Sequence, residues 1–364
     1  MSQHEQIQRI IVARGADPDA VLRIVAQFPH AHVDHQADVP PSRVELAPAP
    51  TAVSRRSLGK HTLVIGSIGR VLDRNAEPSM GDGIVCFPYW HFNAVGNCPY
   101  DCSFCYLAGN RGNLKCPSMK IYTNLDDVMS AITRVAEASD GPVMFYGSKL
   151  QDFIALDAIA EHGQHLVPFA AEHPNIRLLF LTKSDDIEGF LQLNHRGHTM
   201  LSWTLNAEPV IERYETGAPS LDGRLAAARG AADAGYEVRF VFMPMIPIAN
   251  WRRAYADAVR TMLGAVRPSR ITLGGICMYR SALNSMKRHA TSGLSPIIDN
   301  LQPPAFPRDR YRYRPDVRQA LYSHMIDCIR ALDADVPISL CLETPEVWES
   351  VGLDPAESRC NCLL

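Results

Sequence analysis

Residues 97–106 read NCPYDCSFCY and place Cys98, Cys102 and Cys105 in one loop with the spacing C-x3-C-x2-C. Cysteine thiolates are the usual ligands of iron–sulfur clusters, and three of them can bind three corners of a cubane. One iron then lacks a protein ligand and stays open to another molecule, as in an open catalytic zinc site. The loop therefore predicts a [4Fe-4S] cluster. A zinc knuckle with a distant fourth ligand, or a chance grouping, is the alternative, although zinc sites usually pair two-cysteine arms across a longer gap.

Apolar runs of strand length alternate with helical periodicity on the C-terminal side of this loop, and one more such run precedes it. The expected strands are His61–Ser67, Val143–Tyr146, Ile176–Thr182, Met200–Leu205, Glu237–Met243, Arg270–Cys277 and Pro337–Leu342. The expected helices are Leu125–Ala138, Ile154–Ala171, Leu221–Ala234, Tyr255–Leu263 and Val317–Leu332. Such alternation predicts a mostly parallel α/β fold. About six units follow the loop, which favours a partial (β/α)6-type barrel with its chemistry on the loops after the strands.

The two ends of the chain differ from this pattern. Residues 1–30 show apolar residues at helical spacing, and residues 36–58 are rich in Pro, Ser and Ala. We therefore expect an N-terminal helix and linker over 1–58, a barrel core over 59–280 and a divergent C-terminal part over 281–364 that completes the barrel. The tail carries Cys360 and Cys362. It is interpreted as a frayed terminus or as a redox or hydrogen-donor arm over the barrel mouth.

Composition restricts the class of protein. The 364 residues are 46% hydrophobic and 21% charged, the net charge is −3, and no apolar run approaches the length of a membrane helix. The polar N-terminus lacks a signal peptide, so we expect a cytoplasmic protein. Ten cysteines then indicate metal binding or catalysis rather than disulfides. A global basic surplus for duplex DNA is missing. The basic run over residues 308–314 is interpreted as a solvated segment or as a phosphate or carboxylate contact.

The cysteine spacing, with Phe104 and Tyr106 around the third cysteine, resembles the radical S-adenosylmethionine (SAM) superfamily. Residues 63–263 resemble the spore photoproduct lyase family through the segments LTK (181–183), SWTLN (202–206) and ETGAPSLDGR (215–224). The resemblance implies a [4Fe-4S] cluster that cleaves SAM to a 5′-deoxyadenosyl radical, which abstracts hydrogen from a substrate. It also implies an electron donor such as flavodoxin or ferredoxin.

The resemblance carries roles over to five further positions. It implies that Lys183 and Thr204 contact the carboxylate and polar end of SAM, and that Tyr106 contacts the adenine. Gly147 and Ser148 would lay their backbone along the methionine of SAM. Without the resemblance, Lys183 is interpreted as a surface lysine and Tyr106 as a residue of the core. Gly147 and Ser148 are then interpreted as a turn.

One departure from the family concerns the hydrogen donor. Repair lyases place a donor cysteine shortly before an aspartate; aligning that aspartate on Asp152 puts Lys149 at the donor position. An ammonium group cannot donate a hydrogen atom as a thiol does. Cys277 and Tyr146, expected at strand ends, are therefore the candidate donors. We expect a small-molecule, nucleoside or peptide substrate, with repair of spore DNA, or an iron–sulfur or zinc protein without catalysis, as alternatives.

Overall fold

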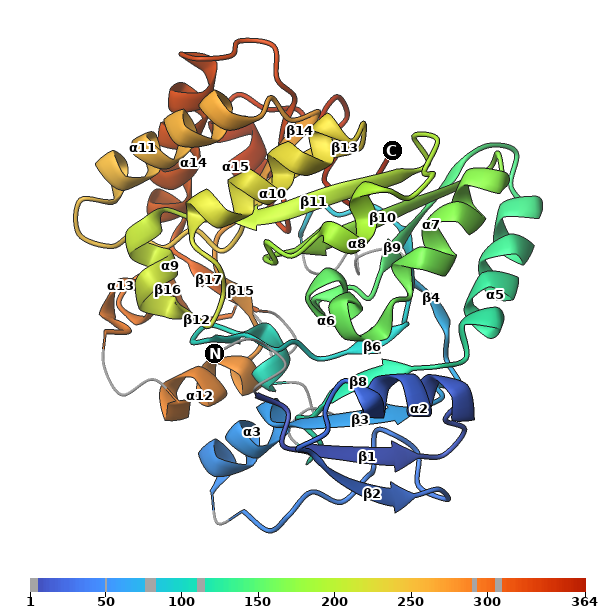
Figure 1. The fold of residues 1–364 in the computed structure, drawn as a ribbon. Helices are drawn as coiled ribbons and strands as arrows, with labels where there is room; N and C mark the ends of the chain where they lie inside the picture. Colours follow the sequence, from blue (N-terminus) through green and yellow to red (C-terminus); the bar gives the residue numbers. More distant parts are fainter. Residues whose placement is uncertain (1–5, 50, 76–82, 110–114, 290–292, 305–309) are drawn as a thin grey trace.

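The computed structural model describes the chain except for residues 1–5, 50, 76–82, 110–114, 290–292 and 305–309. Its centre is an eight-stranded sheet in the order β18-β14-β13-β11-β10-β9-β5-β4, with helices packed on its outside (Figure 1). The strands are β4 (Leu72–Asn75), β5 (Tyr89–Phe92), β9 (Val143–Gly147), β10 (Ile176–Thr182), β11 (Thr199–Leu205), β13 (Glu237–Phe242), β14 (Arg270–Leu273) and β18 (Ile338–Leu340).

Seven of these strands run parallel, and β4 pairs antiparallel with β5. All seven residues of β11 are buried, as expected for a parallel strand with both faces covered. The predicted α/β class is thereby confirmed. In the described part of the chain, β4 and β18 end the sheet without a ladder between them. A single isolated bridge, Val85 to Glu343, joins the segments beside these two edges.

Helices connect consecutive parallel strands and cover the sheet. They are α5 (Leu125–Glu137), α6 (Phe153–Ala160), α7 (Gly163–Glu172), α8 (Glu188–Leu191), α9 (Glu208–Tyr214), α10 (Leu221–Asp233), α11 (Trp251–Ala265), α14 (Pro315–Arg330) and α15 (Pro345–Ser350). The helix predicted over 154–171 is two helices, because Glu161 adopts a left-handed conformation that ends α6. None of the described helices is long and apolar enough to cross a membrane.

A second sheet, in the order β2-β1-β3-β8-β6, contains the N-terminal residues. Its strands are β1 (Arg9–Ala13), β2 (His32–Gln36), β3 (Thr62–Gly66), β6 (Val95–Gly96) and β8 (Met119–Tyr122), with helices α2 (Pro18–Ala26) and α3 (Ala52–Lys60). The helix predicted over 1–30 is therefore wrong for β1, and part of the predicted linker is α3. Because β1 pairs with β3, this sheet spans residue 58, the first predicted boundary. The three-part division stays a prediction.

Short elements complete the fold. They are β7 (Asp101–Cys102), the 3-10 helix η2 (Tyr106–Gly109), β12 (Glu215–Thr216), β15 (Cys277–Met278), α12 (Arg280–His289), α13 (Ser295–Ile298), β16 (Leu301–Gln302) and β17 (Tyr311–Tyr313). The predicted strand Arg270–Cys277 ends early, at Leu273. A side chain at Gly274 would meet Met243, and the Gly275 N–H donates to the Tyr322 hydroxyl. Cys277 consequently starts β15, which pairs with β17.

Candidate functional site

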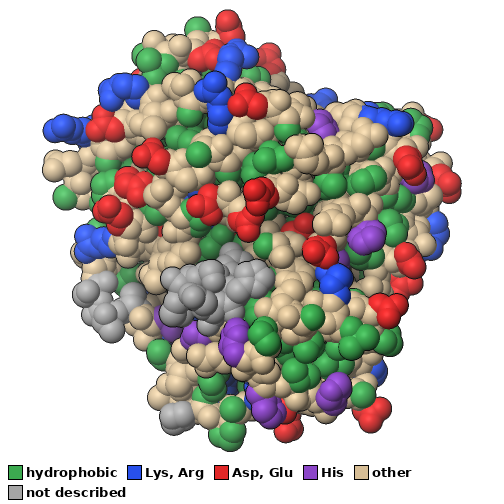
Figure 2. Space-filling model, viewed as in Figure 1, with side chains coloured by type: hydrophobic (Ala, Val, Ile, Leu, Met, Phe, Trp, Pro, Cys, Tyr) green, Lys and Arg blue, Asp and Glu red, His purple; other side chains and the backbone are tan. Residues whose placement is uncertain are grey.

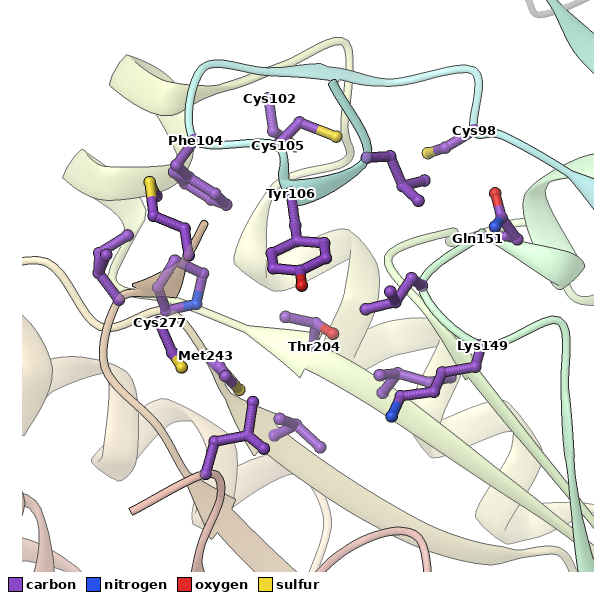
Figure 3. Close-up of a pocket in the computed structure, with 18 of the residues that line it drawn as sticks. Cys98, Cys102, Phe104, Cys105, Tyr106, Lys149, Gln151, Thr204, Met243 and Cys277 are labelled. Atoms are coloured by element: carbon purple, nitrogen blue, oxygen red, sulfur yellow. The ribbon is translucent and has the colours of Figure 1, made fainter. Parts of the chain in front are cut away.

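A cavity of about 450 Å³ lies at the ends of β9, β10, β11 and β13. Eight of the ten site residues predicted from the sequence line it. They are Cys98, Cys102, Cys105, Tyr106, Tyr146, Lys183, Thr204 and Cys277. In Figure 3 the three loop cysteines lie along one side of this cavity, and the Tyr106 ring and Thr204 point into it. Residues far apart in the sequence thus meet at the strand ends, as the predicted barrel requires.

The cysteine loop has little regular structure of its own. Cys102 pairs in a two-residue ladder with Glu215, and Cys105 precedes η2. Among the described residues, no three or more His, Cys, Asp or Glu side chains converge closely enough for one metal ion. A cubane offers a separate iron to each thiolate, so its ligands need no shared ion.

Helix α3 holds the cysteine loop from outside. The Lys60 ammonium donates hydrogen bonds to the carbonyls of Cys98 and Tyr100, and the Arg56 guanidinium donates to the carbonyl of Cys102 at 3.1 Å. Arg56 also forms an ion pair with Asp101. Sequence reasoning missed both cations because α3 was taken for a linker. The available signal was Thr51 followed by Ser54, whose reciprocal hydrogen bonds form a capping box at the helix start.

Burial controls the protonation of two loop thiols. It raises the pKa of Cys102 to about 12, and burial together with the charge of Asp152 raises the pKa of Cys98. Without bound metal, these cysteines are therefore neutral thiols at neutral pH. Only thiolates are effective metal ligands, so metal binding here must release protons.

Lys183 follows β10 and reaches the cavity beneath the loop. Burial by itself would lower the pKa of its ammonium, but the negative charge of the nearby Glu215 carboxylate opposes burial, and the net effect raises the pKa. Lys183 therefore stays charged. Asp152 fixes the end of β10, because its carboxylate accepts from the Thr182 hydroxyl at 2.6 Å and from the Lys183 N–H at 2.8 Å. The sequence analysis used Asp152 only to align the chain with the family, and it did not predict this positioning role.

The segment 215–224 supports the same end of the cavity. Glu215 and Arg224 form an ion pair of 2.5 Å whose side chains are fully buried. Arg224 also donates to the carbonyl of Thr204 at 2.9 Å. Because Glu215 pairs with Cys102, this segment ties the cysteine loop to the strand that carries Thr204. The family-like pattern of residues 215–224 is thus a structural brace for the site.

Gly147 and Ser148 do not line the cavity. The buried Ser148 hydroxyl accepts from the N–H groups of Ala94 and Val95, both at 3.2 Å, and a side chain at Gly147 would collide with the Phe180 ring. In this structure the pair joins β9 to the N-terminal sheet. The predicted backbone contact of these two residues with SAM stays a prediction.

The far side of the cavity carries the departures from the family pattern. The Lys149 ammonium lies 4.0 Å from the centre of the Tyr89 ring, a cation–π distance. Across the cavity from Lys149, Cys277 lies beside Met243 (Figure 3). Arg310 contacts the Cys277 sulfur at 3.8 Å. Arg310 lines the cavity and Arg312 is buried, so the interpretation of this basic run as a solvated segment is wrong for both.

The C-terminal tail is packed, which corrects the expectation of a frayed terminus. Cys360 and Asn361 are buried, and Arg239 and Arg270 donate hydrogen bonds to the carbonyls of residues 360, 361 and 363. The C-terminus lies near the ends at which these strands begin, opposite the cavity mouth (Figure 1). A hydrogen bond from Cys362, together with the charges of Arg270 and Lys149, lowers the pKa of Cys360 to about 7.

The family model of spore photoproduct lyase matches residues 15–273. Spore photoproduct lyase of Clostridium acetobutylicum is 28% identical over 204 residues, which cover 56% of this chain and 57% of that protein. The same enzyme of a Geobacillus species is 28% identical over 217 residues, 59% of this chain and 61% of that protein. The matched segments therefore span less than two thirds of these relatives' lengths.

Solved structures show the same fold. Spore photoproduct lyase complexed with dinucleoside spore photoproduct superposes with a TM-score of 0.76 at 20% identity, and it covers 92% of this chain and 98% of that one. A variant of spore photoproduct lyase with bound AdoMet and dinucleoside spore photoproduct gives a TM-score of 0.77 with the same identity and coverage. With 92% of this chain covered, the superposition extends beyond residues 15–273, which the family model matches.

Proposed function

Because the chain belongs to the spore photoproduct lyase family, we propose that it is a radical SAM enzyme with a [4Fe-4S] cluster on Cys98, Cys102 and Cys105. The observation that carries this proposal is the meeting of these thiols with Lys183 and Thr204 around one cavity. The donor set fits both groups, since thiols suit a cluster and a buried cation beside a hydroxyl suits the carboxylate end of SAM.

The protein's own contribution is placement. When bound, the cluster and SAM supply a 5′-deoxyadenosyl radical. The Lys183 ammonium attracts the carboxylate of SAM, and its charge is maintained by Glu215. The Tyr106 ring, which points into the cavity, offers an apolar face to the adenine. The apolar walls around Leu181, Val241 and Ile276 exclude water from the reacting atoms.

Two observations bear on the substrate, and they favour different answers. The two solved relatives described above are complexed with dinucleoside spore photoproduct, which favours a thymine-dimer repair reaction here as well. Lys149 at the family's donor position, together with the net charge of −3, favours another nucleoside, small molecule or peptide. Basic and acidic side chains are interspersed on the face in Figure 2, which gives no broad track for duplex DNA there.

The presence of Lys149 at the position of the family's donor cysteine also bears on which residue donates the hydrogen atom. With Lys149 unable to donate a hydrogen atom, we propose Cys277 or Tyr146, both of which line the cavity. Tyr146 packs on Tyr89 with ring centres 6.3 Å apart and belongs to the buried cluster that Cys362 contacts. Replacing the true donor preserves SAM cleavage and hydrogen abstraction but diverts product. Normal product from both Cys277→Ala and Tyr146→Phe would remove both residues from this role.

Anaerobic reconstitution followed by reductive SAM cleavage tests the proposed function. We expect 5′-deoxyadenosine from the wild type and none from a Cys102→Ala variant. Adding dinucleoside spore photoproduct separates the substrates, because repair to thymidine supports the lyase reaction, whereas uncoupled SAM cleavage supports a different substrate. An iron-loaded protein that never cleaves SAM would leave only the non-catalytic alternative.

A further inference from the structure

A second cavity, of about 240 Å³, opens between α3 and α12. Figure 1 shows these two helices side by side, although they lie more than two hundred residues apart in the chain. Residues 51–60 of α3 and its cap line one wall, and Ser285 and His289 of α12 line the other. Helix α12 is held close to the loop, since a side chain added at Gly109 of η2 would collide with its backbone at Ala282. We call this second cavity the α3–α12 groove.

The floor of the α3–α12 groove is the cysteine loop. Cys98, Cys105 and Leu107 line both this groove and the large cavity. The loop is therefore the wall between the two, and two of the three proposed cluster ligands are reachable from outside without passing through the substrate cavity. Transfer of an electron falls off steeply with distance, so the place where a donor can approach these cysteines most closely matters for function.

The charge around the groove has one sign. Arg55, Arg56 and Lys60 line it, and none of the described lining residues carries a carboxylate. Lys287 and Arg288, both exposed, extend the positive charge along the last turn of α12. The nearby Asp101 is paired with Arg56. A concentration of cations on a chain of net charge −3 is a local feature with the electrostatics of a steering surface.

Resting on the proposed function, we propose that the α3–α12 groove is the docking surface for an acidic, low-potential electron-transfer protein. The donor loses one electron, and the cluster gains it through the wall formed by Cys98 and Cys105. Arg55, Lys287 and Arg288 steer the donor by charge, as oppositely charged rims do in other complexes. Arg56 and Lys60 donate hydrogen bonds to the loop carbonyls at the point of contact.

Nucleic acid is the other polyanion that cations attract. The geometry favours the protein donor because the positive charge converges on two cysteines of the cluster loop, where an electron carrier gains from contact and a phosphate backbone gains nothing. The groove is also compact, whereas a nucleic acid strand needs cations along its length to neutralise successive phosphates.

The test uses the anaerobically reconstituted full chain and a fluorescently labelled bacterial flavodoxin as the acidic probe. Arg55→Glu/Arg288→Glu reverses one exposed charge of the groove and one on the adjoining last turn of α12. Arg134→Glu/Arg253→Glu reverses two exposed charges on α5 and α11 and is the matched control. We expect the groove variant to bind flavodoxin at least tenfold more weakly at low ionic strength, and the difference to shrink at roughly 0.5 M salt, where charges are screened within a few ångströms.

Iron content and dithionite-driven SAM cleavage are measured on the same samples. Normal values in the groove variant, with slowed cluster reduction by reduced flavodoxin seen by EPR, support the proposal. Equal flavodoxin binding by the groove and control variants overturns it. Loss of binding to a single-stranded oligonucleotide, with flavodoxin binding unchanged, assigns the groove to nucleic acid instead. A protein that assembles no cluster, or never cleaves SAM with dithionite, refutes the proposed function and not the docking surface.

Discussion

Two groups of cysteines in the chain have opposite surroundings. At the mouth of the barrel, Cys98, Cys102 and Cys105 lie on a loop with little regular structure and line the cavity. Toward the closed end, Cys362 packs against a cluster of Tyr89, Met144, Tyr146, Leu179 and Met200, and Cys360 is buried nearby in the tail. The first group is held by cations that contact its backbone. The second group is held by apolar packing and by arginines that pin the tail.

This difference teaches how the same side chain acquires different chemistry. Lys60 and Arg56 bind the carbonyls of the mouth loop and leave its thiols directed to the cavity. Arg239 and Arg270 bind the carbonyls of the tail and bury its thiols in the fold. In both groups a guanidinium or ammonium fixes the backbone, and the direction of the side chains then decides between metal binding and packing.

Removing a mouth cysteine should have the largest effect of any single change. We expect Cys102→Ala to lose most of its iron and all reductive SAM cleavage, because a cubane held by two thiolates is poorly retained. Cys116→Ala is the matched control, since Cys116 is also buried but bonds to Ser118 and lies outside the loop. Iron analysis and 5′-deoxyadenosine production measure both. Full iron occupancy in Cys102→Ala would break the distinction between the groups.

Lys183→Ala should weaken SAM binding without changing iron content. Loss of a charged hydrogen bond costs about 1.5–3 kcal/mol, which corresponds to a dissociation constant raised roughly 10- to 150-fold. Equilibrium binding of SAM to the reconstituted protein measures it. Lys149→Ala is the control cation in the same cavity, and we expect it to retain SAM affinity. Unaltered affinity in Lys183→Ala would show that this cation serves another purpose.

Lys60→Met tests the support of the mouth loop from outside. Two carbonyls, those of Cys98 and Tyr100, lose their donor. Because Lys60 is half-buried, we expect a loss of about 1–2 kcal/mol in loop stability. The measurable result is faster iron release to a chelator, while the Lys115→Met control releases iron at the wild-type rate. Equal release rates would mean that α3 does not hold the loop.

The smallest effect belongs to the closed end. Cys360→Ala removes one buried sulfur, and small truncations of packed side chains cost about 0.5–1.5 kcal/mol. We expect a slightly lower midpoint of thermal unfolding, with iron content and SAM cleavage unchanged. Loss of SAM cleavage at full iron content would instead give the tail a part in the chemistry, and the contrast between the two groups would fail.

The sequence predicted the centre of the fold well because its strands are buried runs between helices. Ile176–Thr182 was predicted with the observed bounds. The failure at β1 has a physical cause, since Ile10 and Ile11 are both fully buried on opposite faces of a parallel strand. By periodicity alone, a continuous apolar run of that kind cannot be distinguished from a segment of a buried helix. Helix α3 was missed because its residues are mostly polar and small.

The residues of the candidate site were likewise predicted only in part. Cysteine spacing is local, so the loop ligands were visible in the sequence. The family-like segments then gave Lys183 and Thr204, which do line the same cavity. The contacts of Arg56 and Lys60 with the loop join residues about forty positions apart, and no local pattern reports them. The packing of the tail likewise depends on arginines in β13 and β14, ninety or more residues away.

The central claim is that the mouth cysteines hold a cluster with one iron open to SAM. The most direct measurement is EPR of the reduced, reconstituted protein with and without SAM. We expect the signal of a [4Fe-4S] cluster whose g-values change when SAM is added, with the change weakened in Lys183→Ala. A cluster signal that SAM leaves unchanged, or a protein that takes up zinc in preference to iron, would contradict the account.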